Sequence, residues 1–261
     1  MDLSQSPFLQ QAAAFAMRLA DAARPLALGY FRQALAIEIK PDQSPVTAAD
    51  RAVEGEMRRL IKEQFPSHGV LGEEYGKSAG SEFTWVLDPI DGTKSYLCGL
   101  PLFGTLIALL HGQQPVLGII DMPAMDERWT GMLGAASSLN SAPARVSACE
   151  RIEQARVFTT SPDMFATEDW QRFNALSRRA AIRRYGGDCY SYGLLASGHC
   201  DLIVETGLQP YDFMALLPVI EGAGGKISDW QGNALNLQSD GHVIAAASPR
   251  LWVQAIDALE R

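Results

Sequence analysis

The sequence predicts an α+β fold, and three observations support this. Several segments carry apolar residues at helical spacing, others are short apolar runs of strand length, and the two kinds are mixed along the chain. The 261 residues are enough to bury a substantial core, as one large domain or as two closely packed ones. The apolar share of 47% and the charged share of 20% are ordinary for a soluble globular protein.

The first half opens with two helical patterns. Residues 7–33 predict a long helix with apolar side chains near one face, and Pro25 is expected to kink or break it. A second helix is expected to begin at Thr47 and to end at Pro66. Its apolar residues recur at helical spacing: Val53, Met57, Leu60 and Ile61.

Strands are expected next. Residues 84–88, TWVLD, predict a strand that ends on an acid, and segments 102–110 and 115–120 predict a hairpin buried on both faces. Residues 95–120 contain no Asp, Glu, Lys or Arg, and a segment of this length could cross a membrane. Its prolines, glycines and His111 favour two buried strands instead, so we expect no membrane contact.

A domain junction is expected around residues 139–145, where small and polar residues replace the apolar runs. The predicted domains are residues 1–139 and residues 140–261. The second half alternates between the two kinds of element. We expect strands at 156–160, 182–186, 201–205, 226–228 and 243–247, and helices at 168–180, 189–197, 211–222 and from 248 onward.

The net charge and the cysteines indicate which partners and which cellular compartment to expect. The net charge is −8, and no run of Lys and Arg offers a surface that could follow a phosphate backbone, so nucleic acid is not an expected partner. The start of the chain lacks the basic and apolar regions of a signal peptide. The four cysteines, which form no CxxC pair, are expected to be reduced, in or near the core, in a cytoplasmic protein: Cys98, Cys149, Cys189 and Cys200.

The segment WVLDPIDGTKS, residues 85–95, brings two carboxylates together after an apolar run. Asp88 and Asp91 are three positions apart, and Pro89 between them directs Asp88 toward extended geometry. Two acids in one site would raise each other's pKa unless a cation lies between them. Because the nearby ligands are oxygens, without a Cys or His pair at metal spacing, Mg²⁺, Mn²⁺ or Ca²⁺ is favoured over zinc.

The residues that follow these acids suit an anion. Gly92 permits close approach of the backbone, Thr93 supplies a hydroxyl, and residues 92–95 could form a helix N-terminus with free N–H groups for phosphate. A cation held by the acids would remove the repulsion between the acids and the phosphate. The segment therefore predicts a metal site beside a phosphate site.

Each acid also has a structural explanation. The pattern D-P-x-D-G is common in surface turns. Glu73 and Glu74, in VLGEEYG, suit a solvated turn, and Asp212 would cap the helix that follows it. Asp50 has the position of the acidic member in a capping box opened by Thr47, and this role could coexist with catalysis.

Five segments taken together resemble the inositol monophosphatase family. They are SPVTAAD, GEE, WVLDPIDGTKS, GGDCYSYGLLA and PYDFMALLPVIEGAGG, and they occur in the family's order through nearly the whole chain. DGTKS, where inositol-type members have DGTTN, is similar to the histidinol-phosphate phosphatase branch, as are GGDCYSYGLLA and LQPYD. The resemblance implies a layered αβαβα sandwich, a homodimer, and a site between the two halves.

The resemblance also implies roles for single residues. Gly92 and Thr93 would donate to the phosphate, and Asp50 would act with Thr93 to orient the attacking water. Two Mg²⁺ ions, with a third and weaker one, would serve hydrolysis of a phosphate monoester, and the ion beside Glu73 would lower the pKa of a bound water. The implied metal ligands are the side chains of Glu73, Asp88, Asp91 and Asp212 and the carbonyl of Ile90.

The resemblance predicts a histidinol-phosphatase, which converts L-histidinol phosphate and water to L-histidinol and phosphate in histidine biosynthesis. Asp188 and Glu205 are candidates to receive the ammonium group of this substrate. Their structural alternatives are a helix N-cap for Asp188 and a solvated acid at a strand end for Glu205. Lys94 would neutralise the phosphate region or fix a loop, and Tyr211 would shape the pocket.

Two other functions stay open. An inositol-1-monophosphatase, or another sugar monophosphatase, would use the same chemistry on a different small phosphorylated substrate. A regulatory binding protein of the same family would have vestigial catalysis. The four histidines are expected to be structural or exposed: His68, His111, His199 and His242.

Overall fold

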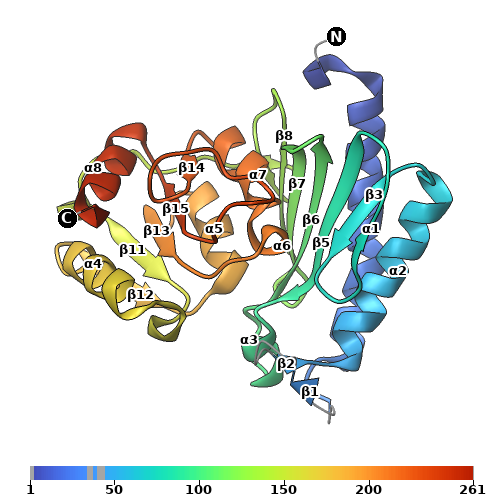
Figure 1. Cartoon of the computed structure of the whole chain (residues 1–261), viewed down its shortest axis with the longest axis horizontal. Helices are drawn as coiled ribbons and strands as arrows, with labels where there is room; N and C mark the ends of the chain where they lie inside the picture. Colours follow the sequence, from blue (N-terminus) through green and yellow to red (C-terminus); the bar gives the residue numbers. More distant parts are fainter. Residues whose placement is uncertain (1–2, 34–37, 40–44, 261) are drawn as a thin grey trace.

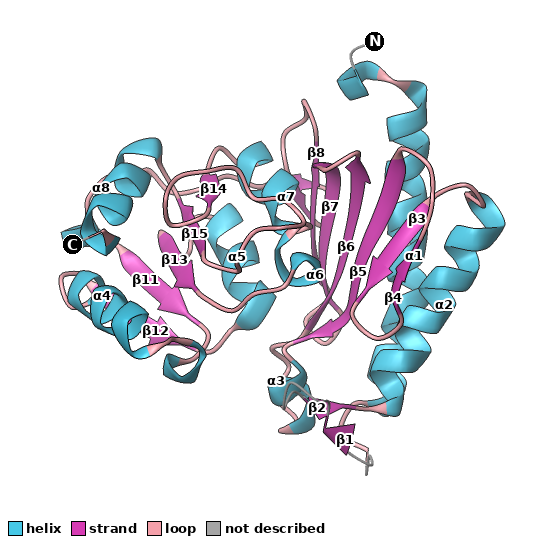
Figure 2. Ribbon diagram, in the orientation of Figure 1, coloured by secondary structure: helices cyan, strands magenta, loops and turns pink. Residues whose placement is uncertain are grey.

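The computed structural model describes residues 3–33, 38–39 and 45–260. Two mixed sheets and three layers of helices alternate, so the expected αβαβα sandwich is confirmed (Figure 1). Figure 2 shows that each sheet has helices on both of its faces. Buried apolar side chains form three clusters: one between the first two long helices and the first sheet, one around the middle helices and reaching both sheets, and one beneath the outermost helices of the second half.

The first layer consists of α1 (Pro7–Tyr30) and α2 (Ala48–Gln64), preceded by a 3-10 turn at Leu3–Gln5. A small ribbon of β1 (Glu38–Ile39) and β2 (Pro45–Val46) lies between the two helices in sequence. α1 continues through Pro25, so the expected break is absent. Packing of the alanine-rich buried face of α1 offsets the missing backbone hydrogen bond at the proline.

The first sheet has eight strands in the order β10-β9-β8-β7-β6-β5-β3-β4. β6 and β7 form the predicted hairpin, and both are buried on both faces along most of their length. The short helix α3 (Thr93–Leu97) follows β5. The strand bounds are β3 Gly69–Gly72, β4 Gly76–Ser78, β5 Phe83–Asp91, β6 Gly104–His111, β7 Gln114–Met122, β8 Glu127–Met132, β9 Ser138–Leu139 and β10 Ala142–Pro143.

The middle layer contains α5 (Asp188–Ala196), α6 (Pro210–Phe213) and α7 (Leu216–Gly222). It packs so closely on the first sheet that a Cβ at Gly118 would lie 2.0 Å from the carbonyl oxygen of Ala215. The single helix expected over 211–222 is wrong. Pro218 has no N–H for the carbonyl of Met214, four residues earlier, and its ring clashes with that carbonyl, so the helix is interrupted at Met214 and Ala215.

The second sheet has five strands in the order β12-β11-β13-β15-β14, and α4 (Thr167–Ser177) and α8 (Pro249–Leu259) cover its outer face. Two 3-10 turns, Ile152–Gln154 and Pro162–Met164, flank its first strand. The helices and strands expected here are present within a few residues of their predicted ends. The strand bounds are β11 Arg156–Thr159, β12 Ile182–Tyr185, β13 Leu202–Glu205, β14 Lys226–Ser228 and β15 Val243–Ala246.

The predicted boundary between residues 139 and 140 falls inside the β9–β10 hairpin, and both strands belong to the first sheet. A division of the chain into two domains stays a prediction.

No helix in the described part of the chain is long and apolar enough to cross a membrane. All four cysteines are free thiols, and Cys98 is exposed, so its expected place in or near the core is wrong.

Candidate active site

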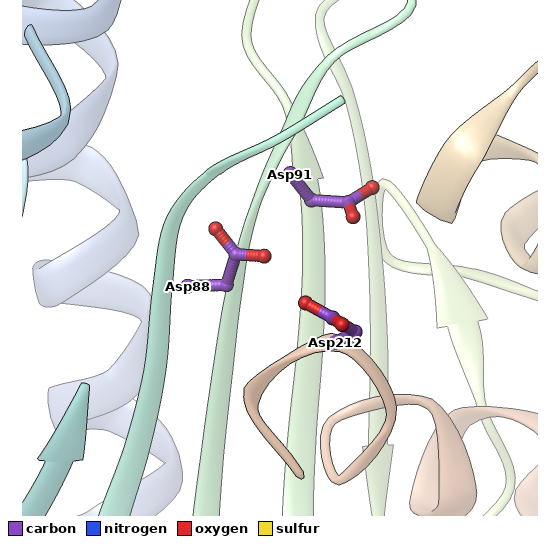
Figure 3. A group of neighbouring side chains, drawn as sticks. All are labelled: Asp88, Asp91 and Asp212. Atoms are coloured by element: carbon purple, nitrogen blue, oxygen red, sulfur yellow. The ribbon is translucent and has the colours of Figure 1, made fainter. Parts of the chain in front are cut away.

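Three carboxylates from two distant segments meet between the first sheet and the middle helices. One ligand oxygen each from Asp88, Asp91 and Asp212 lies within 4.8 Å of the other two. Figure 3 shows these side chains pointing toward a common space, two from the end of β5 and one from α6. Asp88 is buried, and the other two are half-buried.

An irregularity in β5 allows its two acids to share one space. Residues three apart on a regular strand point to opposite faces. The pairing of β5 with β6 shifts between Asp88 and Asp91, which changes the direction of the second side chain. The backbone N–H of Ile90 donates to Oδ1 of Asp88 at 3.1 Å, and the Thr105 hydroxyl donates to the Pro89 carbonyl at 2.8 Å. These bonds hold the turn that carries both acids.

The second half reaches this site through α5 and α6. The backbone N–H of Cys189, near the start of α5, donates to Oδ2 of Asp91 at 2.6 Å. Oδ2 of Asp212 accepts from the backbone N–H of Gln209 at 2.7 Å, so Asp212 also has the capping role that its sequence position suggests. Capping orients the Asp212 carboxylate beside the acids of β5.

Glu73 lies beside the three acids. It follows β3, which is parallel to β5, and its N–H donates to the carbonyl of Leu87 at 3.2 Å. Its negative charge contributes to a raised pKa at both Asp88 and Asp212. The neighbouring Glu74 lies in the same turn, where its backbone N–H donates to a buried carboxylate of α2 at 2.7 Å.

Burial is the largest cause of the shifted pKa values in this site. Burial and the charges of Glu73, Asp91 and Asp212 raise the pKa of Asp88 well above its ordinary value. Burial raises the pKa of Asp212 to about 7. Gathered, partly buried acids are costly to ionise together, and a cation between them reverses this cost. The donor set consists of oxygens only, which fits Mg²⁺ as a hard cation.

The predicted phosphate residues lie directly beyond Asp91. Gly92 has φ +80, and a Cβ there would lie 2.8 Å from the Leu102 carbonyl oxygen, so glycine is required for this approach. The Thr93 hydroxyl donates to the Ile90 carbonyl at 3.1 Å. A hydroxyl has one proton to donate, so in this arrangement Thr93 does not donate to Asp50.

Asp50 is buried at the start of α2 and forms the predicted capping box. Its Oδ2 accepts from the Thr47 backbone N–H at 2.8 Å and from the Thr47 hydroxyl at 2.7 Å. Its sequence position is therefore explained by helix capping, and its part in orienting water stays a prediction.

A cavity of about 140 Å³ adjoins the acids on the side of the second half. Glu205 lies in its wall and is buried, accepting from the Thr160 N–H and the Tyr192 hydroxyl, both at 2.8 Å. The alternative of a solvated acid at a strand end is therefore wrong for Glu205. The cavity is lined by Asp91, Thr160, Met164, Asp188, Cys189, Tyr192, Glu205, Leu208 and Asp212.

Asp188 also lines the cavity, and its backbone has φ 45. Gly187 is the N-cap of α5, so the N-cap alternative is wrong for Asp188. Burial raises the pKa of Asp188, while the Ser95 hydroxyl, 3.2 Å away, and the charge of Lys94 oppose that rise. Lys94 therefore acts on Asp188 electrostatically. Neither Lys94 nor Tyr211 is among the described residues that line this cavity.

Sequence reasoning missed several residues around the site. Tyr192 and Thr160 hold Glu205, and Glu54 of α2 holds the turn after Glu73. Tyr192 lies four positions after Asp188, on the same helical face, which is a signal that could have linked them. Glu54 lies four positions after Asp50 and could have been found in the same way.

Known proteins share this sequence and architecture. A sequence profile of the inositol monophosphatase family matches residues 9–260. "Bifunctional phosphatase IMPL2, chloroplastic" of Arabidopsis thaliana is 44% identical, over 97% of this chain and 76% of its own. A "Histidinol-phosphatase" of Chlorobaculum parvum is 36% identical, over 94% of this chain and 96% of its own. A solved structure of an inositol monophosphatase from Zymomonas mobilis superposes with a TM-score of 0.90 and 43% identity, covering 98% of this chain and 100% of that one.

Proposed function

Because the chain belongs to the inositol monophosphatase family, we propose that it is a Mg²⁺-dependent phosphatase that hydrolyses L-histidinol phosphate to L-histidinol and phosphate. The main support for phosphatase chemistry is that Asp88, Asp91 and Asp212, from both halves of the chain, lie close together. Gly92 and Thr93 follow Asp91 directly in sequence. Acids alone would repel a phosphate group. Acids arranged to hold a divalent cation favour its binding instead.

Two or three Mg²⁺ ions would be held by Glu73, Asp88, Asp91, Asp212 and the Ile90 carbonyl. Bound Mg²⁺ would supply charge neutralisation at the phosphoryl group and a water of lowered pKa. The N–H groups of Gly92 and Thr93 donate to phosphate oxygens and fix the orientation of the ester. Phosphoryl transfer depends mostly on such positioning, so no cysteine acts as a nucleophile.

Thr93 and Asp50 orient the attacking water. The Thr93 hydroxyl donates to the Ile90 carbonyl at 3.1 Å in this structure, so it must turn to engage Asp50. The hydroxyl proton becomes available to Asp50 when the Ile90 carbonyl has another partner. Asp50 then accepts a hydrogen bond from the Thr93 hydroxyl, and the Thr93 oxygen accepts a hydrogen bond from the attacking water.

The acidic cavity supports the choice of substrate. Histidinol phosphate carries an ammonium group, and Asp188 and Glu205 both line the cavity beside the proposed metal site. Glu205 accepts two hydrogen bonds in this structure, which leaves carboxylate lone pairs for an ammonium donor. The relative from Chlorobaculum parvum bears the same activity in its name.

A paired assay tests the substrate. The purified protein with Mg²⁺ is offered L-histidinol phosphate and inositol 1-phosphate, and we expect a clear preference for the first. Glu205→Gln should lower kcat/KM for histidinol phosphate by about 10- to 100-fold, because a hydrogen bond to a charged group typically contributes free energy of that size. Glu127→Gln, a half-buried glutamate outside the lining of this cavity, is the matched control. A preference for inositol 1-phosphate would reject this substrate.

Inositol-1-monophosphatase activity is the second candidate, and the Zymomonas mobilis structure, at 43% identity, favours it. A regulatory binding role is the third, and a biological role that survives loss of the Asp91 carboxylate would support it. A homodimer in the cytoplasm stays a prediction.

A further inference from the structure

Glu54 is a completely buried acid on α2 that the proposed chemistry does not use. Its carboxylate accepts three hydrogen bonds. Arg58 donates from Nε at 2.6 Å, and the backbone N–H groups of Glu74 and Tyr75 donate at 2.7 and 3.2 Å. The two backbone donors belong to the turn between β3 and β4 that begins with Glu73.

This carboxylate lies directly against the backbone that leads into Glu73. A Cβ at Gly72 would lie 2.1 Å from Oε1 of Glu54, so only glycine leaves room for the contact. On its other side the turn is held by the N–H of Glu73, which donates to Leu87 of β5. The turn is therefore held between α2 and the strand that carries Asp88.

Arg58 alone would be enough to pair the buried charge. It also donates to the carbonyl of Gly76 at the far end of the same turn, so both members of the ion pair bind this turn. A carboxylate that only stabilised α2 would need no contact with N–H groups twenty positions away in sequence. Glu54 therefore contacts the backbone on both sides of Glu73, at Gly72 and at Glu74.

We propose that Glu54 is a positioning residue that holds Glu73 beside Asp88 in readiness for a divalent cation. This inference rests on the proposed function, because it assigns Glu73 to the metal site. Groups that orient a metal ligand typically contribute 10- to 100-fold to metal affinity.

The test is Glu54→Gln, with Mg²⁺ and Mn²⁺ binding measured by calorimetry without substrate. The amide nitrogen of glutamine cannot accept, so at least one turn N–H or Arg58 loses its partner. We expect affinity for both ions to fall about 10- to 100-fold, while kcat at saturating Mg²⁺ stays near that of the unchanged protein. Glu56→Gln, on the same helix but half-exposed and paired with Arg59, should leave affinity unchanged.

Glu54→Asp is the second variant, because it keeps the buried charge for Arg58 but shortens the reach to the turn. It should weaken metal binding as well. If either variant folds, loses thermal stability and keeps the metal affinity of the unchanged protein, Glu54 has a structural role only and the inference is overturned. If the unchanged protein itself binds neither ion and hydrolyses no phosphate ester, the proposed function fails first.

Discussion

The backbone N–H of Cys189 donates to the Asp91 carboxylate across 2.6 Å, which joins the start of α5 to the end of β5. The two residues are 98 positions apart in sequence. The bond places the N-terminal turn of a helix against the acidic cluster, where N–H groups stabilise negative charge. The cluster therefore depends on the contact between the first sheet and the middle helices, and changes at that contact should alter metal binding.

Asp91→Asn should abolish hydrolysis, with a loss on the order of 10³-fold or more, because metal-ion charge stabilisation is worth several kcal/mol. The same change should stabilise the metal-free protein. Burial and the charges of Asp188 and Asp212 raise the pKa of Asp91, so its ionised form is disfavoured and a neutral amide relieves the repulsion. A gain of about 1 kcal/mol would raise Tm by about 2–4 °C.

The measurements are initial rates with Mg²⁺ and thermal unfolding in a chelator. Asp163→Asn, at an exposed position, is the control and should change neither. A variant that keeps its activity would show that Asp91 is not needed for the reaction.

Mg²⁺ affinity should rise with pH. Burial raises the pKa of Asp212 from 3.8 to about 7, so the metal-free protein holds a proton there below that pH. Since the cation requires the carboxylate, binding displaces this proton, and the release from Asp212 alone should contribute up to about tenfold in affinity per pH unit below pH 7. Calorimetry in buffers of different ionisation enthalpy measures the released proton. A constant affinity over this range would refute the coupling.

The same shift predicts the opposite trend for metal-free stability. A carboxyl group whose pKa is higher in the folded state than in the unfolded state binds protons preferentially when folded. The metal-free protein should therefore become more stable as pH falls from about 7 toward the ordinary value of 3.8. Saturating Mg²⁺ should remove this trend in thermal unfolding, because it keeps the site deprotonated.

His68 should make the protein sensitive to acid. Its Nδ1 accepts from the indole N–H of Trp85 at 3.1 Å, and its ring stacks on Phe65. Burial lowers the pKa of His68 from 6.5, so the unfolded chain takes up the proton first as pH falls. The contribution of His68 to stability is complete above pH 6.5 and is lost as pH falls from there toward the lower folded-state pKa.

Urea unfolding in saturating Mg²⁺, which removes the opposing contribution of Asp212, measures this loss between about pH 7 and pH 5. The free energy of unfolding should fall less steeply with decreasing pH in His68→Asn, which cannot titrate, than in the unchanged protein. His199→Asn, at an exposed position, should keep the original slope. Equal slopes for all three proteins would contradict the role assigned to His68.

Gly118→Ala should disturb both the fold and the site. Its Cβ would lie 2.0 Å from the Ala215 carbonyl oxygen, three residues after Asp212, so the segment between α6 and α7 must move. We expect a loss of about 1–3 kcal/mol in unfolding free energy and weaker Mg²⁺ binding.

Gly55→Ala is the matched control, since nothing lies within 4 Å of its Cβ and it is inside a helix. It should stabilise the protein by about 0.5–1 kcal/mol, because alanine is a better helix former than glycine. Urea midpoints compare the two variants, and a Gly118→Ala protein as stable as the unchanged one would be inconsistent with the close packing.

Local signals in the sequence predicted most of the helices and strands. The capping box of Thr47 and Asp50 involves contacts within four residues, so the sequence alone indicates it. β8 was not predicted, because its polar residues interrupt the strand pattern. The buried charge of Arg128 is paired with two acids, Asp121 on the neighbouring strand, which accepts from its Nε, and Asp21 of α1. Pairing of this kind is not visible in the pattern of one segment.

The sequence by itself determined the kinds of groups available: acids at the end of an apolar strand, a glycine and a hydroxyl after them, and a family pattern that connects them. Only the tertiary structure decided that Asp91 and Asp212 face one space, that Glu205 is buried, and that Glu54 holds the turn of Glu73. The reason is physical. Backbone propensities and caps act over a few residues, whereas distances between remote carboxylates are set by how the sheets and helices pack.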